Sequence, residues 1–307
     1  MRAEGEFMKH LLSIEALTGD EIAGIVELAV RMKAERGRHG SQPLAGQCWG
    51  LMFSKSSTRT RVSFEVGIRE LGGDVMFLSA NDIQLGRGEL IKDTARVMGR
   101  MLGGAVIRTF AQSDVEQFAE YSGIPTINAL TDDEHPCQIL ADLQTIKEKL
   151  GSYAGRKVCF VGDGACNVAR SWIWAAARCG FELTIAAPEK YQPEEALLDA
   201  VDGAKIRVTA DLEEAARGAE VLYTDVWVSM GKEEEAVFRV AQLSEYQINR
   251  KLVAAAAPGA LVMHCLPAYR EKEITDEVFE EHAGTIFDEA ENRLHAQKAV
   301  LELLGGG

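Results

Sequence analysis

The stretch FSKSSTRTRVSFEVGIRELGG, residues 53–73, concentrates hydroxyl groups and cations in a chain whose formal net charge is -14. The apolar run CWGLMF ends at Phe53, and Phe64, Ile68 and Leu71 then recur at helical spacing. The pattern predicts a buried strand that leads into a helix. The polar side chains at the start of this helix are Lys55, Ser56, Ser57, Thr58, Arg59, Thr60 and Arg61.

This predicted helix N-terminus is a candidate phosphate site. Exposed N–H groups and the positive end of the helix dipole attract anions there. The hydroxyls of Ser57, Thr58 and Thr60 add donors, and the Arg59 guanidinium offers a planar fork that matches phosphate oxygens. The structural alternative is a solvated helix cap whose arginines pair with surface acids.

Composition limits the classes of function. With 307 residues, 47% of them hydrophobic and 26% charged, the chain can form two domains or one large α/β domain. The 47 acidic residues outnumber the 33 basic ones, which argues against binding to nucleic acid or to an anionic membrane. Any anion site must therefore be local.

The six cysteines lack CxxC spacing, which argues against a zinc ribbon or a disulfide framework and favours a reducing compartment. The segment MRAEGEFMKHLL lacks the long apolar core of a signal peptide, and no later run is long and apolar enough to span a membrane. We therefore expect a cytoplasmic protein. Since Met8 is a possible start, we expect residues 1–7 to carry no function.

Strand and helix patterns alternate along both halves of the chain. A capping box, Thr18-x-x-Glu21, opens a first helix, and a helical face that includes Leu102 follows the loop SANDIQLGRGEL. Strands are expected at residues 48–53, 74–78, 104–109, 125–130, 157–163, 182–187, 206–210, 221–227 and 260–267. Such alternation predicts two α/β domains with parallel sheets covered by helices.

We place the domain boundaries where the pattern restarts. The first domain covers residues 1–137, an interdomain helix 138–151, and the second domain 152–290. A C-terminal helix over 291–307 is expected to return to the first domain.

Two further motifs follow predicted strands of the second half. In VGDGACNVARS, Gly162 and Gly164 form half of a dinucleotide fingerprint, but Asn167 stands where a third glycine is needed. A tight strand-to-helix turn and a nucleotide site both remain open. In TDVWVSMG, Asp225 either holds a substrate ammonium group or caps the next helix.

Two short motifs carry candidate polar groups. In DEHPCQ, a neutral His135 beside Gln138 is able to donate to a carbonyl oxygen, although a structural hydrogen bond is the plainer reading. In MHCLP, Cys265 ends an apolar strand, where open α/β sheets present ligands. A buried, inert cysteine is the alternative. No neighbouring motif supplies a base, so we do not expect a covalent nucleophile.

The motifs STRTR, HPCQ, DVWVSMG, HCLP and FDEAENRLHAQKAVL, in this order, resemble the signature set of the transcarbamoylases, and of the ornithine carbamoyltransferases in particular. The resemblance covers nearly the whole chain from about Met8. It implies that carbamoyl phosphate binds the first domain, that ornithine binds the second, and that the products are citrulline and phosphate, in arginine biosynthesis. A neutral δ-amine attacks the carbamoyl carbon in this chemistry, which needs no metal or organic cofactor.

The resemblance assigns the carbamoyl phosphate site by position. The hydroxyls and the cation of the first motif hold the phosphate, Arg108 bridges phosphate and carbamoyl oxygen, and His135 and Gln138 hold the carbamoyl group. Arg293 reaches the carbamoyl oxygen, and Gln84 enters the site of a neighbouring subunit in a homotrimer with shared active sites. The phosphate-binding residues are Ser57, Thr58, Arg59 and Thr60.

The same resemblance assigns the ornithine site. The α-carboxylate and α-amino group are bound by Asn167, Asp225, Ser229 and Met230. Cys265, with the Leu266 backbone, orients the side-chain amine, and both also border the carbamoyl phosphate site. The implied catalytic residues are Arg108, His135, Cys265 and Arg293.

Several alternatives stay open. Aspartate carbamoyltransferases resemble HPLP where this chain has HCLP and lack the SMG loop, and enzymes for putrescine or acylated ornithine also depart there. A catabolic ornithine carbamoyltransferase, a nicotinamide-dependent dehydrogenase and a non-catalytic phosphate- or amino-acid-binding module remain as further alternatives.

Overall fold

The computed structural model describes residues 8–38, 40–79, 89–228 and 233–306. The chain divides into two compact units, one formed by Met1–Ala141 with Asn292–Gly307 and the other by Asp142–Glu291. The divisions fall within two helices, α5 (Pro136–Leu150) and α12 (Ala283–Gly305). Both units contain a parallel sheet with helices, as the alternating sequence pattern predicts.

The sheet of the first unit contains the strands β1 (Cys48–Phe53), β2 (Asp74–Ser79), β3 (Gly104–Arg108) and β4 (Thr126–Leu130) in the order β2-β1-β3-β4. All its pairings are parallel. The order changes direction between β1 and β3, because β2 lies on one side of β1 and the later strands lie on the other.

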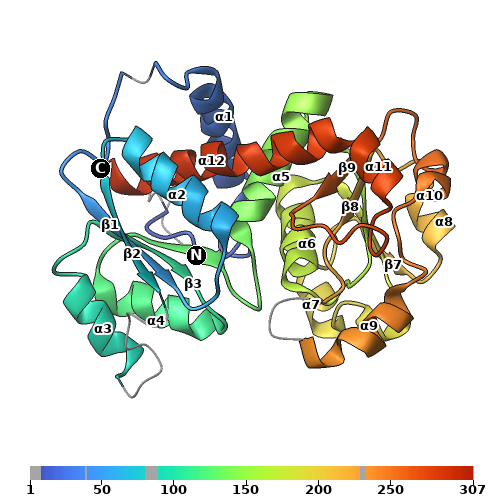
Figure 1. Cartoon of the computed structure of the whole chain (residues 1–307), viewed down its shortest axis with the longest axis horizontal. Coiled ribbons are helices and arrows are strands. Elements are labelled where there is room, and N and C mark those ends of the chain that lie inside the picture. Colours follow the sequence, from blue (N-terminus) through green and yellow to red (C-terminus); the bar gives the residue numbers. More distant parts are fainter. Residues whose placement is uncertain (1–7, 39, 80–88, 229–232, 307) are drawn as a thin grey trace. The chain divides into compact units, whose positions relative to one another are not determined.

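The helices that cover this sheet are α1 (Gly19–Ala34), α2 (Thr58–Glu70), α3 (Ile91–Met98) and α4 (Gln112–Ser122). Figure 1 shows α3 and α4 together beneath the sheet. Met52 and Ile107 of the strands pack with Ala95 of α3 and Phe118 of α4 in one apolar cluster. Helix α2 packs at a different place from this cluster, where its Gly67 lies against α12.

The sheet of the second unit contains the strands β5 (Lys157–Val161), β6 (Glu182–Ala186), β7 (Ile206–Thr209), β8 (Val221–Thr224) and β9 (Leu261–His264) in the order β7-β6-β5-β8-β9. All its pairings are parallel. The strand order changes direction between β5 and β8. There the Thr224 hydroxyl donates to the Val161 carbonyl at 2.7 Å.

The helices of the second unit are α6 (Asn167–Cys179), α7 (Glu195–Ala200), α8 (Leu212–Ala216), α9 (Ala236–Leu243), α10 (Arg250–Ala255) and α11 (Asp276–Glu281), with 3-10 turns η1 (Glu189–Tyr191) and η2 (Glu233–Glu235). Helices α8, α10 and α11 contribute Ala216, Leu252 and Phe279 to the main apolar cluster. On α6, Trp172 meets Tyr223 of β8 edge-to-face.

Local signals in the sequence agree with the structure at several points. The Thr18 hydroxyl accepts from the Glu21 amide at 3.2 Å while the Glu21 carboxylate accepts from the Thr18 amide at 2.8 Å, which confirms the capping box.

Helix α3 is shorter than expected, because it ends at Met98, before the expected Leu102. The C-cap is Gly99, a poor helix former, and a Cβ at this position would lie 1.8 Å from the Ser122 carbonyl oxygen at the end of α4.

Helix α12 is longer than its apolar stripe suggests. It begins at Ala283, ahead of the apolar face expected from residue 291 onward. Its first turns place Ile286 in the core of the second unit. Among the described residues, no helix has the length and apolar character needed to cross a membrane.

Candidate active site

The polar stretch lies at the N-terminus of α2, as predicted, and Ser57 is the N-cap. Ser57 has extended backbone angles, and its hydroxyl accepts from the Thr60 amide at 3.3 Å. The Ser57 and Thr60 hydroxyl oxygens lie 2.9 Å apart. Thr58 and Arg59 are exposed, whereas Thr60 is buried. This end of the helix therefore presents amide groups, hydroxyls and a guanidinium, the groups that bind phosphate.

Buried cations lie near this cap in the first unit. The Arg293 guanidinium on α12 donates to the Thr60 hydroxyl oxygen at 2.7 Å. Arg108 ends β3, and its carbonyl accepts from the Ser54 amide at 2.8 Å, next to the loop that carries the cap. Both guanidinium side chains are largely buried. They bring fixed positive charge to the place where the strand order changes direction.

His135 lies buried in the turn that opens α5. Burial, followed by the positive charges of Arg293 and Arg108, holds the pKa of His135 well below its usual value. The imidazole is therefore neutral at physiological pH and is able to donate a hydrogen bond without carrying a charge. Gln138, one turn further along α5, is fully buried.

Lys55 lies in the polar stretch, and no sequence signal indicates its role. Its side chain is buried, pairs with the carboxylate of Asp132, and lies 4.3 Å from the centre of the Phe110 ring. Lys55 follows β1, and Asp132 follows β4. The lysine thus joins the loop of the helix cap to the turn that carries His135.

In the second unit, Asp225 and Cys265 meet at the ends of neighbouring strands. The Cys265 thiol donates to the Asp225 carboxylate at 2.9 Å, and the Val226 amide donates to the same oxygen at 2.7 Å. Burial and the Asp225 charge raise the pKa of the Cys265 thiol well above its usual value, and burial also raises the pKa of Asp225. The thiol is therefore a hydrogen-bond donor, which agrees with an orienting role.

Buried groups support the turn after Cys265. The Leu266 amide donates to His264 Nδ1 at 2.9 Å, and His264 Nε2 lies 3.2 Å from a Glu273 carboxylate oxygen. Since Nδ1 accepts, the imidazole proton of a neutral His264 is on Nε2 and points at Glu273. Leu266 itself has a φ of 56°, in the left-handed region.

The turn after β5 carries the other candidate for amino-acid binding. Asn167 is the first residue of α6, and its side-chain oxygen accepts from the Val168 amide at 2.9 Å. The Cys166 sulfur caps this helix by accepting from the Ala169 amide at 3.4 Å. A Cβ on Gly164 would lie 2.6 Å from Ile185, so this glycine is required for a close approach.

The remaining predicted site residues lie outside the described residues: Gln84, Ser229 and Met230. Within each unit, the other candidates gather at strand ends. The part of the chain that the structure describes contains no cluster of three or more histidine, cysteine or acidic side chains arranged to hold a metal ion.

Comparisons with known proteins identify a known family domain in each half of the chain. Residues 9–148 match the family model described as aspartate/ornithine carbamoyltransferase, carbamoyl-P binding domain, and residues 154–304 match its Asp/Orn binding domain. The chain belongs to the aspartate/ornithine carbamoyltransferase family. As a member it is a carbamoyltransferase, which confirms the resemblance of the sequence motifs.

Individual relatives span nearly the full chain. The chain is 61% identical to an ornithine carbamoyltransferase of Akkermansia muciniphila over 97% of its own length and 98% of that protein. The crystal structure of the anabolic ornithine carbamoyltransferase of Campylobacter jejuni is similar with a TM-score of 0.91 and 41% identity, covering 97% of this chain and 99% of that one. An ornithine carbamoyltransferase from Pyrococcus furiosus gives a TM-score of 0.92 at 43% identity, covering 97% of both chains.

The lowered pKa of His135 makes the stability of this carbamoyltransferase depend on pH. Below about pH 6.5 the unfolded chain takes up a proton at this histidine while the folded chain does not, so folding is destabilised by up to about 1.4 kcal/mol per pH unit. In His135→Gln, the loss of stability between pH 7 and pH 5 should be smaller than in the wild type, as measured by urea unfolding.

His282→Gln is the matched control. This histidine is only half-buried, and burial lowers its pKa less strongly. We expect the acid dependence of this control to stay close to that of the wild type. An unchanged acid dependence in His135→Gln would show that His135 does not stay neutral in the folded protein.

Proposed function

We propose that the chain is an ornithine carbamoyltransferase, which converts carbamoyl phosphate and L-ornithine into L-citrulline and phosphate. The observation that carries the proposal is the Cys265–Asp225 hydrogen bond, 2.9 Å long, because it joins the HCLP motif to the DVWVSMG motif. These two motifs distinguish ornithine carbamoyltransferases from aspartate carbamoyltransferases, whose corresponding motif resembles HPLP. The similarity to ornithine carbamoyltransferases of other organisms supports the same substrate.

In the proposed mechanism, the first unit binds carbamoyl phosphate. The α2 N-terminus, with Ser57, Thr58, Arg59 and Thr60, holds the phosphate group. Gln138 holds the carbamoyl amide. Donors from Thr60, Arg108, His135 and Arg293 stabilise the negative charge that develops on the carbamoyl oxygen. Each such donor typically contributes about 3 kcal/mol to lowering the barrier.

The second unit binds the amino acid. Asp225 and Asn167, with Ser229 and Met230, bind the α-ammonium and α-carboxylate of ornithine. Cys265 and the Leu266 backbone orient the δ-amine and border the carbamoyl group. Because an exposed alkyl ammonium has a pKa of about 10.4, desolvation and neighbouring cations must favour the free amine. The amine attacks the carbamoyl carbon, the bond to phosphate breaks, and the leaving phosphate takes the released proton.

We also propose a biosynthetic role, in the formation of arginine, in the cytoplasm. One similar structure is described as that of an anabolic ornithine carbamoyltransferase, and the proposed direction follows it. All six cysteines are free in the structure, which is consistent with a reducing compartment.

We further propose that the two domains meet at residue 151 and that residues 138–151 form an interdomain helix.

An amine panel tests the proposed substrate. Purified enzyme is incubated with carbamoyl phosphate and, separately, with ornithine, acetylated ornithine, putrescine or aspartate, and ureido product is measured colorimetrically. We expect ornithine to give the highest kcat/KM by a wide margin. A preference for another amine would contradict the assignment, and ureido product from none of them would favour a binding module.

Shared sites in a homotrimer are the second part of the proposal. Its basis is Gln84, which lies outside the described residues and matches a position that enters the neighbouring subunit in the family. Arg59→Ala and Gln84→Ala variants, each impaired alone, should regain activity when mixed under conditions of subunit exchange, because some sites then receive both intact residues. If verified mixed trimers show no recovery, each subunit uses its own Gln84.

A further inference from the structure

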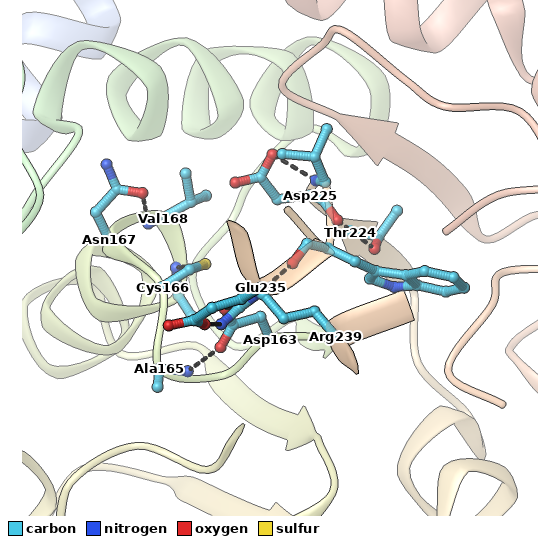
Figure 2. A network of polar contacts seen from close by, with 12 residues as sticks. Asp163, Ala165, Cys166, Asn167, Val168, Thr224, Asp225, Glu235 and Arg239 are labelled. Atoms are coloured by element: carbon cyan, nitrogen blue, oxygen red, sulfur yellow. Dashed lines mark hydrogen bonds and ion pairs between the residues drawn. The ribbon is translucent and has the colours of Figure 1, made fainter. Parts of the chain in front are cut away.

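A buried ion pair connects the two turns that carry the candidate amino-acid ligands. Arg239, on α9, pairs through its guanidinium with the carboxylate of Asp163, in the turn after β5. Both side chains are about 95% buried, with exposed fractions of 5% and 4%. Figure 2 shows the pair below the Asn167 and Asp225 side chains.

Each partner is itself anchored to one of the turns. The other oxygen of the Asp163 carboxylate accepts from the Ala165 amide at 3.1 Å, which fixes the turn that leads to Asn167. Arg239 Nε donates to the Trp227 carbonyl at 2.7 Å, two residues after Asp225. The pair therefore spans the place where the strand order of the second sheet changes direction.

Further contacts hold the guanidinium in place. Its carbon lies 4.8 Å from the centre of the Tyr191 ring, and its Nη1 lies 3.4 Å from the exposed Glu235 carboxylate. Tyr191 and Trp227 belong to a small apolar cluster with Leu243 of α9. The guanidinium thus has one fixed position, which suits a spacer between two turns.

Cys166 marks how closely the two turns approach each other. After burial, the negative charges of both Asp163 and Asp225 raise the pKa of the Cys166 thiol. Cys166, next to Asn167, therefore lies within electrostatic reach of both turns. Charge alone gives no reason to keep the pair, since a buried ion pair is often no more stabilising than apolar residues of similar volume.

We propose that Arg239 and Asp163 are positioning residues for the amino-acid substrate. They set the spacing between the turn of Asn167 and the turn of Asp225, and so the fit of the α-carboxylate and α-ammonium groups. This inference rests on the proposed function and adds two residues that contact neither substrate. It predicts an effect confined to ornithine.

The test uses the intact enzyme with three variants. Arg239→Lys keeps the charge but loses the planar fork, and Asp163→Asn keeps the shape but loses the charge. In each, the ornithine KM should rise roughly tenfold, a size typical of coupling between contacting residues, while the carbamoyl phosphate KM stays within a factor of two. The double variant Asp163→Asn/Arg239→Met leaves neither charge unpaired.

The double variant separates positioning from stability. Its melting temperature should return toward that of the wild type, because no uncompensated charge is buried, but its ornithine KM should stay raised. If the ornithine KM recovers together with the melting temperature, the pair acts only through stability, and the inference is wrong.

Glu220→Gln is the matched control. It removes an ion pair with Arg156, 2.6 Å long, which lies at the N-terminal ends of β5 and β8, whereas Asn167 and Asp225 follow the C-terminal ends. Its ornithine KM should match that of the wild type. Normal ornithine KM values in Arg239→Lys and Asp163→Asn would overturn this inference and leave the proposed function standing. Wild-type enzyme that forms no citrulline would overturn both.

Discussion

The parallel order of the two sheets determines where polar side chains gather in this protein. All strands of a parallel sheet end at the same edge, and a crevice forms where neighbouring strands send their connections to opposite faces. In the first unit this place lies between β1 and β3, where the α2 cap and Arg108 are found. In the second it lies between β5 and β8, where Asn167 and Asp225 are found. Each unit therefore has a place at its sheet edge that is suited to a polar ligand.

Burial gives the side chains at these two places different chemistry. In the first unit, burial, followed by fixed guanidinium charges, keeps a histidine neutral, so the site offers cations and neutral donors to an anionic ligand. In the second unit, a protonated thiol and a carboxylate share a hydrogen bond, so the site offers negative charge to an ammonium group. This difference matches one phosphate-bearing substrate and one amine-bearing substrate.

Local sequence signals predicted much of the fold and part of the site. Hydrophobic period located the strands and the helix that follows Ser57, and a capping box located α1, because these features depend on neighbouring residues. Strand order and long-range pairs have no such signal. Arg239 and Asp163 are 76 positions apart, and although Asp163 lies in VGDGACNVARS, no motif links it to Arg239. Lys55 was visible in the polar stretch, but its burial and its partner Asp132 emerge only from the fold. Arg293 was assigned through family resemblance, and its contact with Thr60 depends on the packing of α12.

The central claim is that each unit binds its own substrate. Binding calorimetry on Arg59→Ala and Asp225→Asn tests it most directly, with a stable phosphonate analogue of carbamoyl phosphate added first and ornithine second. Arg59→Ala should lose about 2 to 5 kcal/mol of analogue binding, as expected when a charged contact that the bound ligand desolvates is removed. Asp225→Asn should bind the analogue nearly as the wild type does and should bind ornithine weakly. If folded Asp225→Asn loses analogue binding as severely as Arg59→Ala, the two units do not divide the substrates in this way.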